Sequence, residues 1–160
     1  MEEDTMGLFS AIFGETTEAK AMRWMDELWE ALPQLLPQGD AYERSEDEPE
    51  IIIRHGSAHV VVGIGSDDEG DGYVIIKSPL VFLPKENLLP FYRRLLDLNC
   101  GDLMLGALAT EGNTVFLRTT VPMAGLDEEG FGFWVFSTLG LADELDDLLI
   151  DEFGARRFEN

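Results

Sequence analysis

The sequence predicts a single α+β domain, with the element order α-β-β-β-α-β-β-α and with helices mainly on one face of an antiparallel sheet. A length of 160 residues suits one domain built around one hydrophobic core. Three stretches repeat apolar residues at helical spacing, and five shorter apolar runs are bounded by turn residues. We therefore predict a folded domain over residues 16–158, preceded by a flexible N-terminal arm over residues 1–15.

The first helix is predicted over residues 17–32, with Thr16 or Thr17 as its N-cap. Its apolar stripe consists of Ala21, Met25, Leu28, Trp29 and Leu32. Pro33 and Pro37 are expected to end the helix, because proline lacks the backbone N–H that a helix interior needs. The polar run that follows is predicted to lead as a loop to the sheet.

Three strands are predicted next, over residues 50–54, 58–65 and 73–82. The first two are joined by a two-residue turn at Gly56 and Ser57. Alternation places one set of apolar residues on a common face: Ile51, Ile53, Val60, Val62 and Ile64. Ile52 and Val61 make the other face partly apolar, so that a second packing partner is possible there.

The acid-rich stretch GIGSDDEGDGYVIIKSPL, between the second and third strands, resembles a metal-binding loop in composition. A calcium loop of the EF-hand type needs a bidentate glutamate at position 12 and a helix on each side. Counted from Asp67, position 12 is Ser78, and both flanks are strands. We interpret the stretch as a solvated turn. His55 and His59 lie on either side of a chain reversal with no cysteine near them, so no zinc site and no cofactor are predicted.

A second helix is predicted to begin close to Glu86 and to end at residues 99–101. Its expected buried stripe consists of Leu88, Phe91, Tyr92, Leu95 and Leu96. Cys100 is interpreted as a small buried residue. A hairpin follows, with a tight turn at residues 111–113, in which Val115 and Leu117 share one face while Phe116 and Arg118 share the other.

The last helix is predicted over residues 131–153, and its two halves differ in character. The first half is apolar on several sides, so it is either enclosed by the domain or exposed as a dimer seam or client groove. The second half carries acids and no basic residue, expected on the outside as a solvated face or a docking surface. Gly132 and Gly140 suggest close approach of another backbone. The candidate partner or dimer surface comprises Phe131, Phe133, Trp134, Phe136, Leu139, Asp143, Asp146 and Asp147.

The net charge of −21 is the dominant global property of the chain. Such a surface repels phosphate backbones, which argues against direct nucleic-acid binding, and it attracts basic proteins. The sequence contains no GxSxG, HExxH or P-loop motif and only one cysteine. We therefore expect a non-enzymatic protein. With one cysteine, no basic leader and no long apolar stretch, the expected location is cytoplasmic, without membrane contact.

From about residue 50 to residue 158 the sequence resembles the YbjN family of small bacterial proteins. The likeness is carried by "SPLVFLPKENL", "LNC…LGALA", "VFLRTTVPMAGL" and "LADELDDLLIDEFG". The family is similar in fold to the type III secretion chaperones, which are small, acidic, usually dimeric proteins that hold client polypeptides without consuming ATP. The resemblance thus implies a chaperone-like fold, a protein client and a homodimer. It implies no catalytic residues.

Taken together, the residues and the resemblance favour a chaperone-like or adaptor-like module that holds a basic protein, with nucleic-acid-binding proteins among the candidates. The apolar patch would grip the partner and the acidic faces would steer it. A nucleic-acid-mimicking inhibitor and a small-ligand sensory regulator are the alternatives. A divalent-metal-dependent enzyme is less favoured, and its first candidate acids would be Asp67, Asp68 and Asp71.

Overall fold

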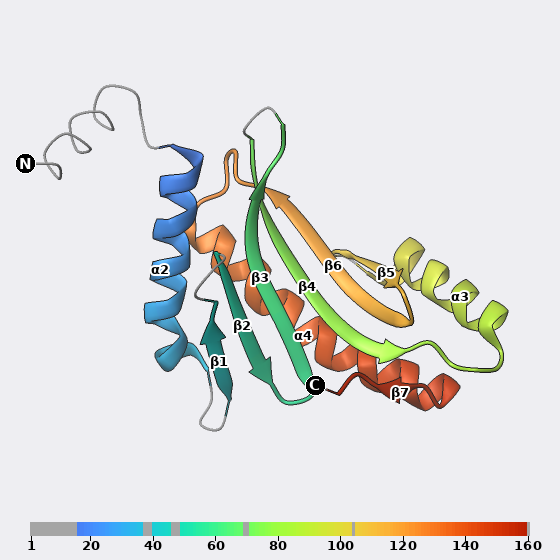
Figure 1. Cartoon of the computed structure of the whole chain (residues 1–160). Helices are drawn as coiled ribbons and strands as arrows, with labels where there is room; N and C mark the ends of the chain where they lie inside the picture. Colours follow the sequence, from blue (N-terminus) through green and yellow to red (C-terminus); the bar gives the residue numbers. More distant parts are fainter. Residues whose placement is uncertain (1–15, 37–39, 46–48, 69–70, 104, 160) are drawn as a thin grey trace, which may run out of the picture.

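The computed structural model describes residues 16–36, 40–45, 49–68, 71–103 and 105–159. Within these ranges it contains three α-helices and seven strands, which form one α+β domain (Figure 1). The predicted fold class is confirmed. The predicted N-terminal arm, residues 1–15, lies outside the described residues.

The strands form one antiparallel sheet with the spatial order β1-β2-β3-β4-β6-β5. The bounds of these strands are β1 Ala41–Arg44, β2 Glu50–His55, β3 Ala58–Ser66, β4 Gly72–Phe82, β5 Ala107–Glu111 and β6 Thr114–Pro122. A seventh strand, β7 (Arg156–Arg157), pairs with the end of β4 beyond the part that pairs with β3. The tight turns fall where they were predicted, at Gly56 and Gly112, and both glycines have positive φ.

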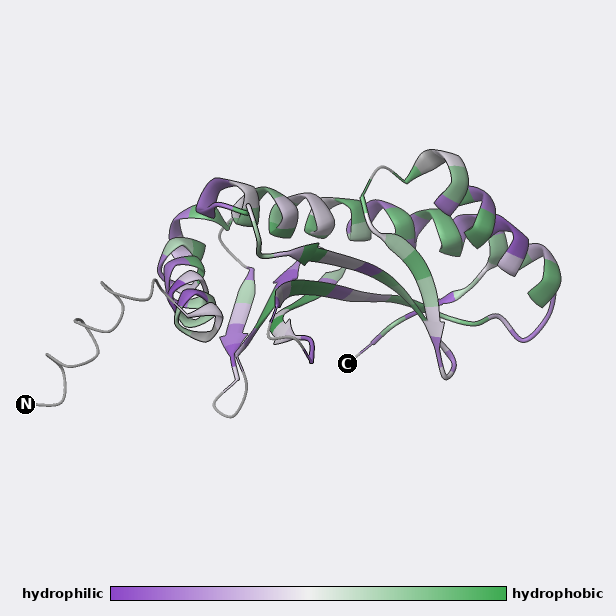
Figure 2. Cartoon of the chain, turned by 90° about the horizontal axis from the view of Figure 1, so that it is seen from above, coloured by the Kyte–Doolittle hydropathy of each residue, from purple (hydrophilic) through white to green (hydrophobic). Residues whose placement is uncertain are grey.

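The core lies between one face of the sheet and the helices α2 (Thr17–Leu35) and α4 (Glu128–Phe153). α4 crosses β3 and β4, while α2 lies beside the β1–β2 end (Figure 1). One sheet face is fully buried beneath the helices through Ile51, Ile53, Val60, Val62, Val74 and Ile76. Burial of one such side chain stabilises the fold by about 1.5–3 kcal/mol. In the view of Figure 2, α4 lies on one side of the sheet and the C-terminus on the other.

α2 is longer than predicted, because Pro33 lies inside it and the helix continues to Leu35. The prediction that Pro33 ends the helix is therefore wrong. A proline removes one backbone hydrogen bond, and in the last turn little helix remains to be disrupted. The N–H of Leu36 still donates to the carbonyl of Leu32, at 3.0 Å. At the other end, the Thr16 hydroxyl oxygen accepts from the Ala19 N–H at 3.1 Å, as expected of an N-cap.

Two strands were not predicted. β1 lies within the run that was expected to be a loop. Because it contains charged side chains, its sequence lacks the alternation of apolar residues that would predict a strand. Its Tyr42 packs edge-on against Trp29 of α2, with ring centroids 5.1 Å apart. Charged residues are typical of edge strands, where they discourage pairing with other chains. β7 has only two residues, both arginine, so no hydrophobic pattern marks it.

The expected buried stripe of the second helix is only partly correct. α3 (Leu88–Asp97) buries Phe91 and Leu95, whereas Leu88, Tyr92 and Leu96 are exposed. The helix has too many large apolar residues for one narrow contact face, and periodicity alone could not show which of them face the core. A π-helical turn (Leu98–Asp102) follows. It contains Cys100, which is exposed instead of buried.

The expectation of a close backbone approach at Gly132 and Gly140 is also wrong for the described residues. A side chain added at either glycine would have no neighbouring atom within 4 Å. Both glycines lie inside α4, where each weakens the helix by about 1 kcal/mol relative to alanine. No contact within the described part of the chain explains them.

Candidate functional site

The five apolar residues of the predicted partner surface are mostly enclosed by the domain. Phe131 and Leu139 are each 3% exposed, so they belong to the core. Trp134 and Phe136 are half-buried against that core. Phe133 alone of these five is well exposed, at 57%. Within one chain, the first half of α4 therefore presents a small apolar surface instead of a continuous patch.

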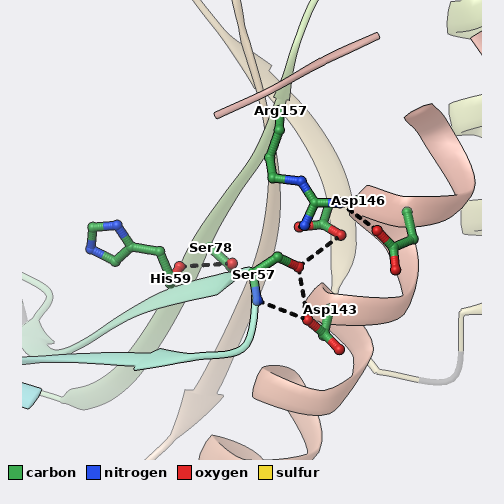
Figure 3. A network of polar contacts seen from close by, with 7 residues as sticks. Ser57, His59, Ser78, Asp143, Asp146 and Arg157 are labelled. Carbon is green, nitrogen blue, oxygen red and sulfur yellow. Dashed lines mark hydrogen bonds and ion pairs between the residues drawn. The ribbon is translucent and has the colours of Figure 1, made fainter. Parts of the chain in front are cut away.

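The three acids of the predicted surface meet the tip of the β2–β3 hairpin and the C-terminal strand in a polar junction (Figure 3). Asp147 is exposed and Asp143 is half-buried, but Asp146 is only 2% exposed. The expectation that all acids of α4 lie outside is thus wrong for Asp146. The junction consists of Ser57 from the hairpin, these three aspartates from α4, and Arg157 from β7.

Ser57 contacts both inner carboxylates of the junction. Its hydroxyl lies 2.8 Å from Oδ1 of Asp143 and 3.2 Å from Oδ1 of Asp146. A hydroxyl has one hydrogen, so it can donate fully to only one of them. Burial raises the pKa of Asp146, although the Ser57 hydroxyl and Arg157 oppose the change. If Asp146 is protonated, its carboxyl group can donate to the Ser57 oxygen while the Ser57 hydroxyl donates to Asp143. Both short contacts of Ser57 are then hydrogen bonds.

Asp143 has the opposite electrostatic setting. Its Oδ1 accepts from the Ser57 hydroxyl and from the Ser57 backbone N–H, at 2.8 and 3.1 Å. These two hydrogen bonds lower the pKa of Asp143 below its ordinary value. The hairpin tip lies close to α4 at this contact. A Cβ atom added at Gly56 would be only 2.9 Å from Oδ1 of Asp143. Glycine suits position 56 because its φ is positive, and a side chain there would also displace the Asp143 carboxylate.

Arg157 closes the junction from β7. Its guanidinium donates to Oδ2 of Asp146 at 3.2 Å and also pairs with Asp147. β7 is anchored to the end of β4, where the N–H of Phe158 donates to the carbonyl of Leu80 at 3.0 Å. The junction therefore ties the C-terminal segment, α4 and the hairpin together. Its hydrogen bonds and ion pairs hold three elements together, which is the arrangement of a structural clamp.

The acid-rich turn after β3 does not form a metal site in the described part of the chain. Asp67 accepts from the Asp71 N–H at 2.9 Å and from the Tyr73 hydroxyl at 3.2 Å, so its carboxylate serves the turn itself. Across all described residues, no group of three or more His, Cys, Asp or Glu side chains could hold a metal ion. Residues 69 and 70 of this stretch lie outside the description.

The sheet face opposite α4 carries a half-open hollow of about 550 Å³. Its apolar lining comes from Val61, Ile75, Pro79, Phe116 and Phe158. Two strand glycines, Gly63 and Gly65, also line it, together with the polar residues Glu50, His59 and Lys77. The His59 side chain points away from the polar junction in Figure 3. Desolvation, helped by the nearby charge of Arg54, lowers the pKa of His59, which favours its neutral form.

A second exposed apolar surface lies on α3. It comprises Leu88, Leu89, Tyr92 and Leu96, whose exposed fractions are 41%, 80%, 38% and 67%. Their spacing places them along one side of the helix, beside the buried Phe91 and Leu95. We call these four residues the α3 stripe. One signal for it was present in the sequence, because Leu89 adds to a helix that already has more apolar residues than one contact face needs.

A comparison with protein-family models gave a match over residues 33–151. The matched family is YbjN, with the description "Putative bacterial sensory transduction regulator". The match covers more than half of the 160-residue chain. The chain belongs to the YbjN family. The YbjN match includes β1 and the polar run before β2, but it excludes most of α2 and the C-terminal strand β7. A search of curated proteins gave no match.

Membership of the YbjN family fits a non-enzymatic regulatory or binding role. No helix among the described residues of this YbjN chain is long and apolar enough to cross a bilayer. Sequence reasoning missed the hollow on the open face of the sheet. The available signal was the pair Gly63 and Gly65, two residues apart in a strand otherwise rich in valine and isoleucine.

Proposed function

We propose that this protein is a non-enzymatic regulatory module, chaperone-like or adaptor-like, that binds a basic protein partner through the acidic outer face of α4. The observation that carries the proposal is the charge distribution. The chain has a net charge of −21, and Glu144 and Asp151 are exposed on α4 without an ion pair among the described residues. The YbjN description supports a regulatory role. A cytoplasmic location is part of this proposal.

Basic partners include nucleic-acid-binding proteins, whose cationic surfaces would otherwise contact phosphates. Complementary charge accelerates the encounter and makes it sensitive to salt. The apolar contact surface expected on the first half of α4 is limited to Phe133 and the exposed parts of Trp134 and Phe136. The acidic face is therefore the main element of recognition in this proposal.

The test is affinity capture with three forms of the chain: wild type, Glu144→Gln/Asp151→Asn, and the control Asp68→Asn/Glu86→Gln. The control removes the same charge from exposed positions away from α4. We expect a basic partner, identified by mass spectrometry, that wild type and control retain in dilute salt. The α4 variant should lose it, and so should every form in about 0.5 M NaCl. A partner held equally by all three forms, or insensitive to salt, would contradict the proposal.

Competition with DNA separates this function from nucleic-acid mimicry. A mimic occupies the DNA-binding surface of its partner, so DNA should displace it completely. An adaptor that binds elsewhere on the partner should remain in a ternary complex with DNA and the partner. Gel filtration of the three components distinguishes the two outcomes.

The expected homodimer also belongs to the proposal, and the α3 stripe is the surface best suited to it. Two chains of charge −21 repel each other over most of their surfaces. Around α3 the balance differs, because Lys85, Arg93 and Arg94 lie there with Glu86, Asp97 and Glu152, the last of which pairs with Arg94. A second copy can therefore approach this helix with less repulsion and cover its exposed leucines.

A further inference from the structure

Two glycines in β3, Gly63 and Gly65, are unexplained by the packing of the domain. Neither has a positive φ. A side chain added at Gly65 would meet the Cδ1 atom of Ile75 at 3.6 Å, and one added at Gly63 would meet Glu50 at 3.4 Å. Alanine would therefore fit at Gly65, and at Gly63 with little adjustment of the flexible Glu50 side chain. Glycine inside a strand weakens the strand, and it often marks a place where a ligand approaches the backbone closely.

The space that these glycines leave open is part of the hollow on the sheet face opposite α4. A volume of about 550 Å³ lies within the range of small-molecule sites. The hollow is bordered by Phe158 of the C-terminal segment and by Pro49 before β2. Its lining is mainly apolar with a few polar groups, which is the usual composition of a ligand site.

Lys77 gives the hollow a cation, which is unusual on a chain with 11 basic and 32 acidic residues. Its ammonium lies 4.1 Å from the ring centroid of Phe116 and pairs with Glu111. The Glu111 side chain is 70% exposed, so solvent weakens the pair. Arg118 of β6 lies directly opposite Lys77 of β4 in the strand register, so both side chains stand on the same face of the sheet. An incoming carboxylate can therefore replace Glu111 at Lys77.

We propose that this hollow binds a small amphipathic carboxylate, with its apolar body on Val61, Ile75 and Phe116 and its carboxylate on Lys77. The space above Gly63 and Gly65 admits the body of the ligand close to the strand backbone. Lys77 supplies the charge that selects an anion. This site lies on the opposite side of the sheet from α4, so it is independent of the protein-binding function proposed above.

Isothermal titration calorimetry of the full chain with decanoate tests the site, with decan-1-ol and decylammonium as headgroup controls. We expect saturable one-to-one binding of decanoate and at least tenfold weaker binding of both controls. Lys77→Gln should weaken decanoate binding at least tenfold, because the carboxylate loses its cation. Glu111→Gln should strengthen it, because the competing carboxylate is gone. Both substitutions are at partly exposed positions, so the opposite signs of their effects report on the site and not on folding.

Gly65→Val tests whether the ligand occupies the hollow itself. Valine suits a strand and fills the space above the backbone, so the melting temperature should not fall while decanoate binding is lost. Nuclear magnetic resonance shifts on decanoate addition should concentrate in β3, β4 and β6. The proposal is overturned if decanoate does not bind saturably, or if decylammonium binds equally well. Retained binding in Gly65→Val, or shifts confined to α3, would overturn it too.

Discussion

Asp143 and Asp146 lie one helical turn apart on α4 and contact the same serine, yet their pKa values shift in opposite directions. Asp143 receives two hydrogen bonds from Ser57, whereas Asp146 is buried beneath the hairpin tip and Arg157. Position along the sequence could not separate them, because both belong to the same acidic run. The difference arises where three elements meet.

Asp146 gives a pH-dependent prediction. Its pKa is raised by burial above the ordinary value of about 3.9, so the folded chain keeps this proton after the unfolded chain has lost it. Its contribution to stability is therefore complete below the ordinary pKa and declines as pH rises through the raised pKa. Asp146→Asn should remove this decline. Urea unfolding between about pH 4 and pH 7 should show the variant gaining free energy of unfolding relative to wild type as pH rises, and parallel pH curves would contradict the assignment.

Asp143→Asn serves as the matched control with the opposite sign. The pKa of Asp143 is lowered by the Ser57 hydroxyl and N–H, so its stabilisation is present above the ordinary pKa and is lost as pH falls. At neutral pH the substitution should cost about 1 kcal/mol, the scale of a hydrogen bond to a charged acceptor in a partly exposed site. The loss should shrink towards pH 4. The same urea series measures it.

At the scale of elements, α3 departs most from the sequence expectation, since it exposes much of its apolar surface. Leu89→Glu/Leu96→Glu should convert the proposed dimer to monomers, because four buried carboxylates would meet across the interface. The substituted side chains are 80% and 67% exposed in one chain, so the monomer should lose less than about 0.5 kcal/mol of stability for each. Sedimentation velocity measures the oligomeric state.

Leu35→Glu is the control for this experiment. Leu35 is 55% exposed at the end of α2, away from α3, and its substitution should leave the oligomeric state unchanged. A wild-type chain that stays monomeric over the accessible concentration range would refute the dimer. A double variant that remains dimeric would show that the two copies meet elsewhere.

For the molecule as a whole, net charge is the dominant property, and it affects stability. Eleven basic residues offset only part of the 32 acids, and several of them are already used in internal pairs such as Arg94 with Glu152. The remaining acids repel one another in the compact state more than in the unfolded chain.

Raising NaCl from about 0.02 to 0.5 M should therefore increase the melting temperature, on the order of a few degrees, as the Debye length shortens. Differential scanning calorimetry gives the measurement. The Glu144→Gln/Asp151→Asn variant should show a smaller increase, because less repulsion remains to be screened. A melting temperature that is unchanged or falls with salt would show that repulsion does not limit stability.

Periodicity in the sequence predicted much of the fold correctly. The α+β class, the hairpin turns at Gly56 and Gly112, and the alternation of Val115 and Leu117 with Phe116 and Arg118 are all present in the structure. These features depend on local preferences and on one-sided burial, both of which are visible in residue order. β1 and β7 were missed because pairing with a neighbouring strand, and not their own composition, makes them strands.

The sequence by itself determined the acidic character of the chain, its fold class and its YbjN resemblance. The tertiary structure alone decided which apolar residues remain exposed, which acid is buried and where the open hollow lies. Exposure of Leu89, burial of Asp146 and the space above Gly65 each depend on what segments distant in the chain place next to them. Local sequence sets the face on which a side chain stands, whereas packing determines whether that face is covered.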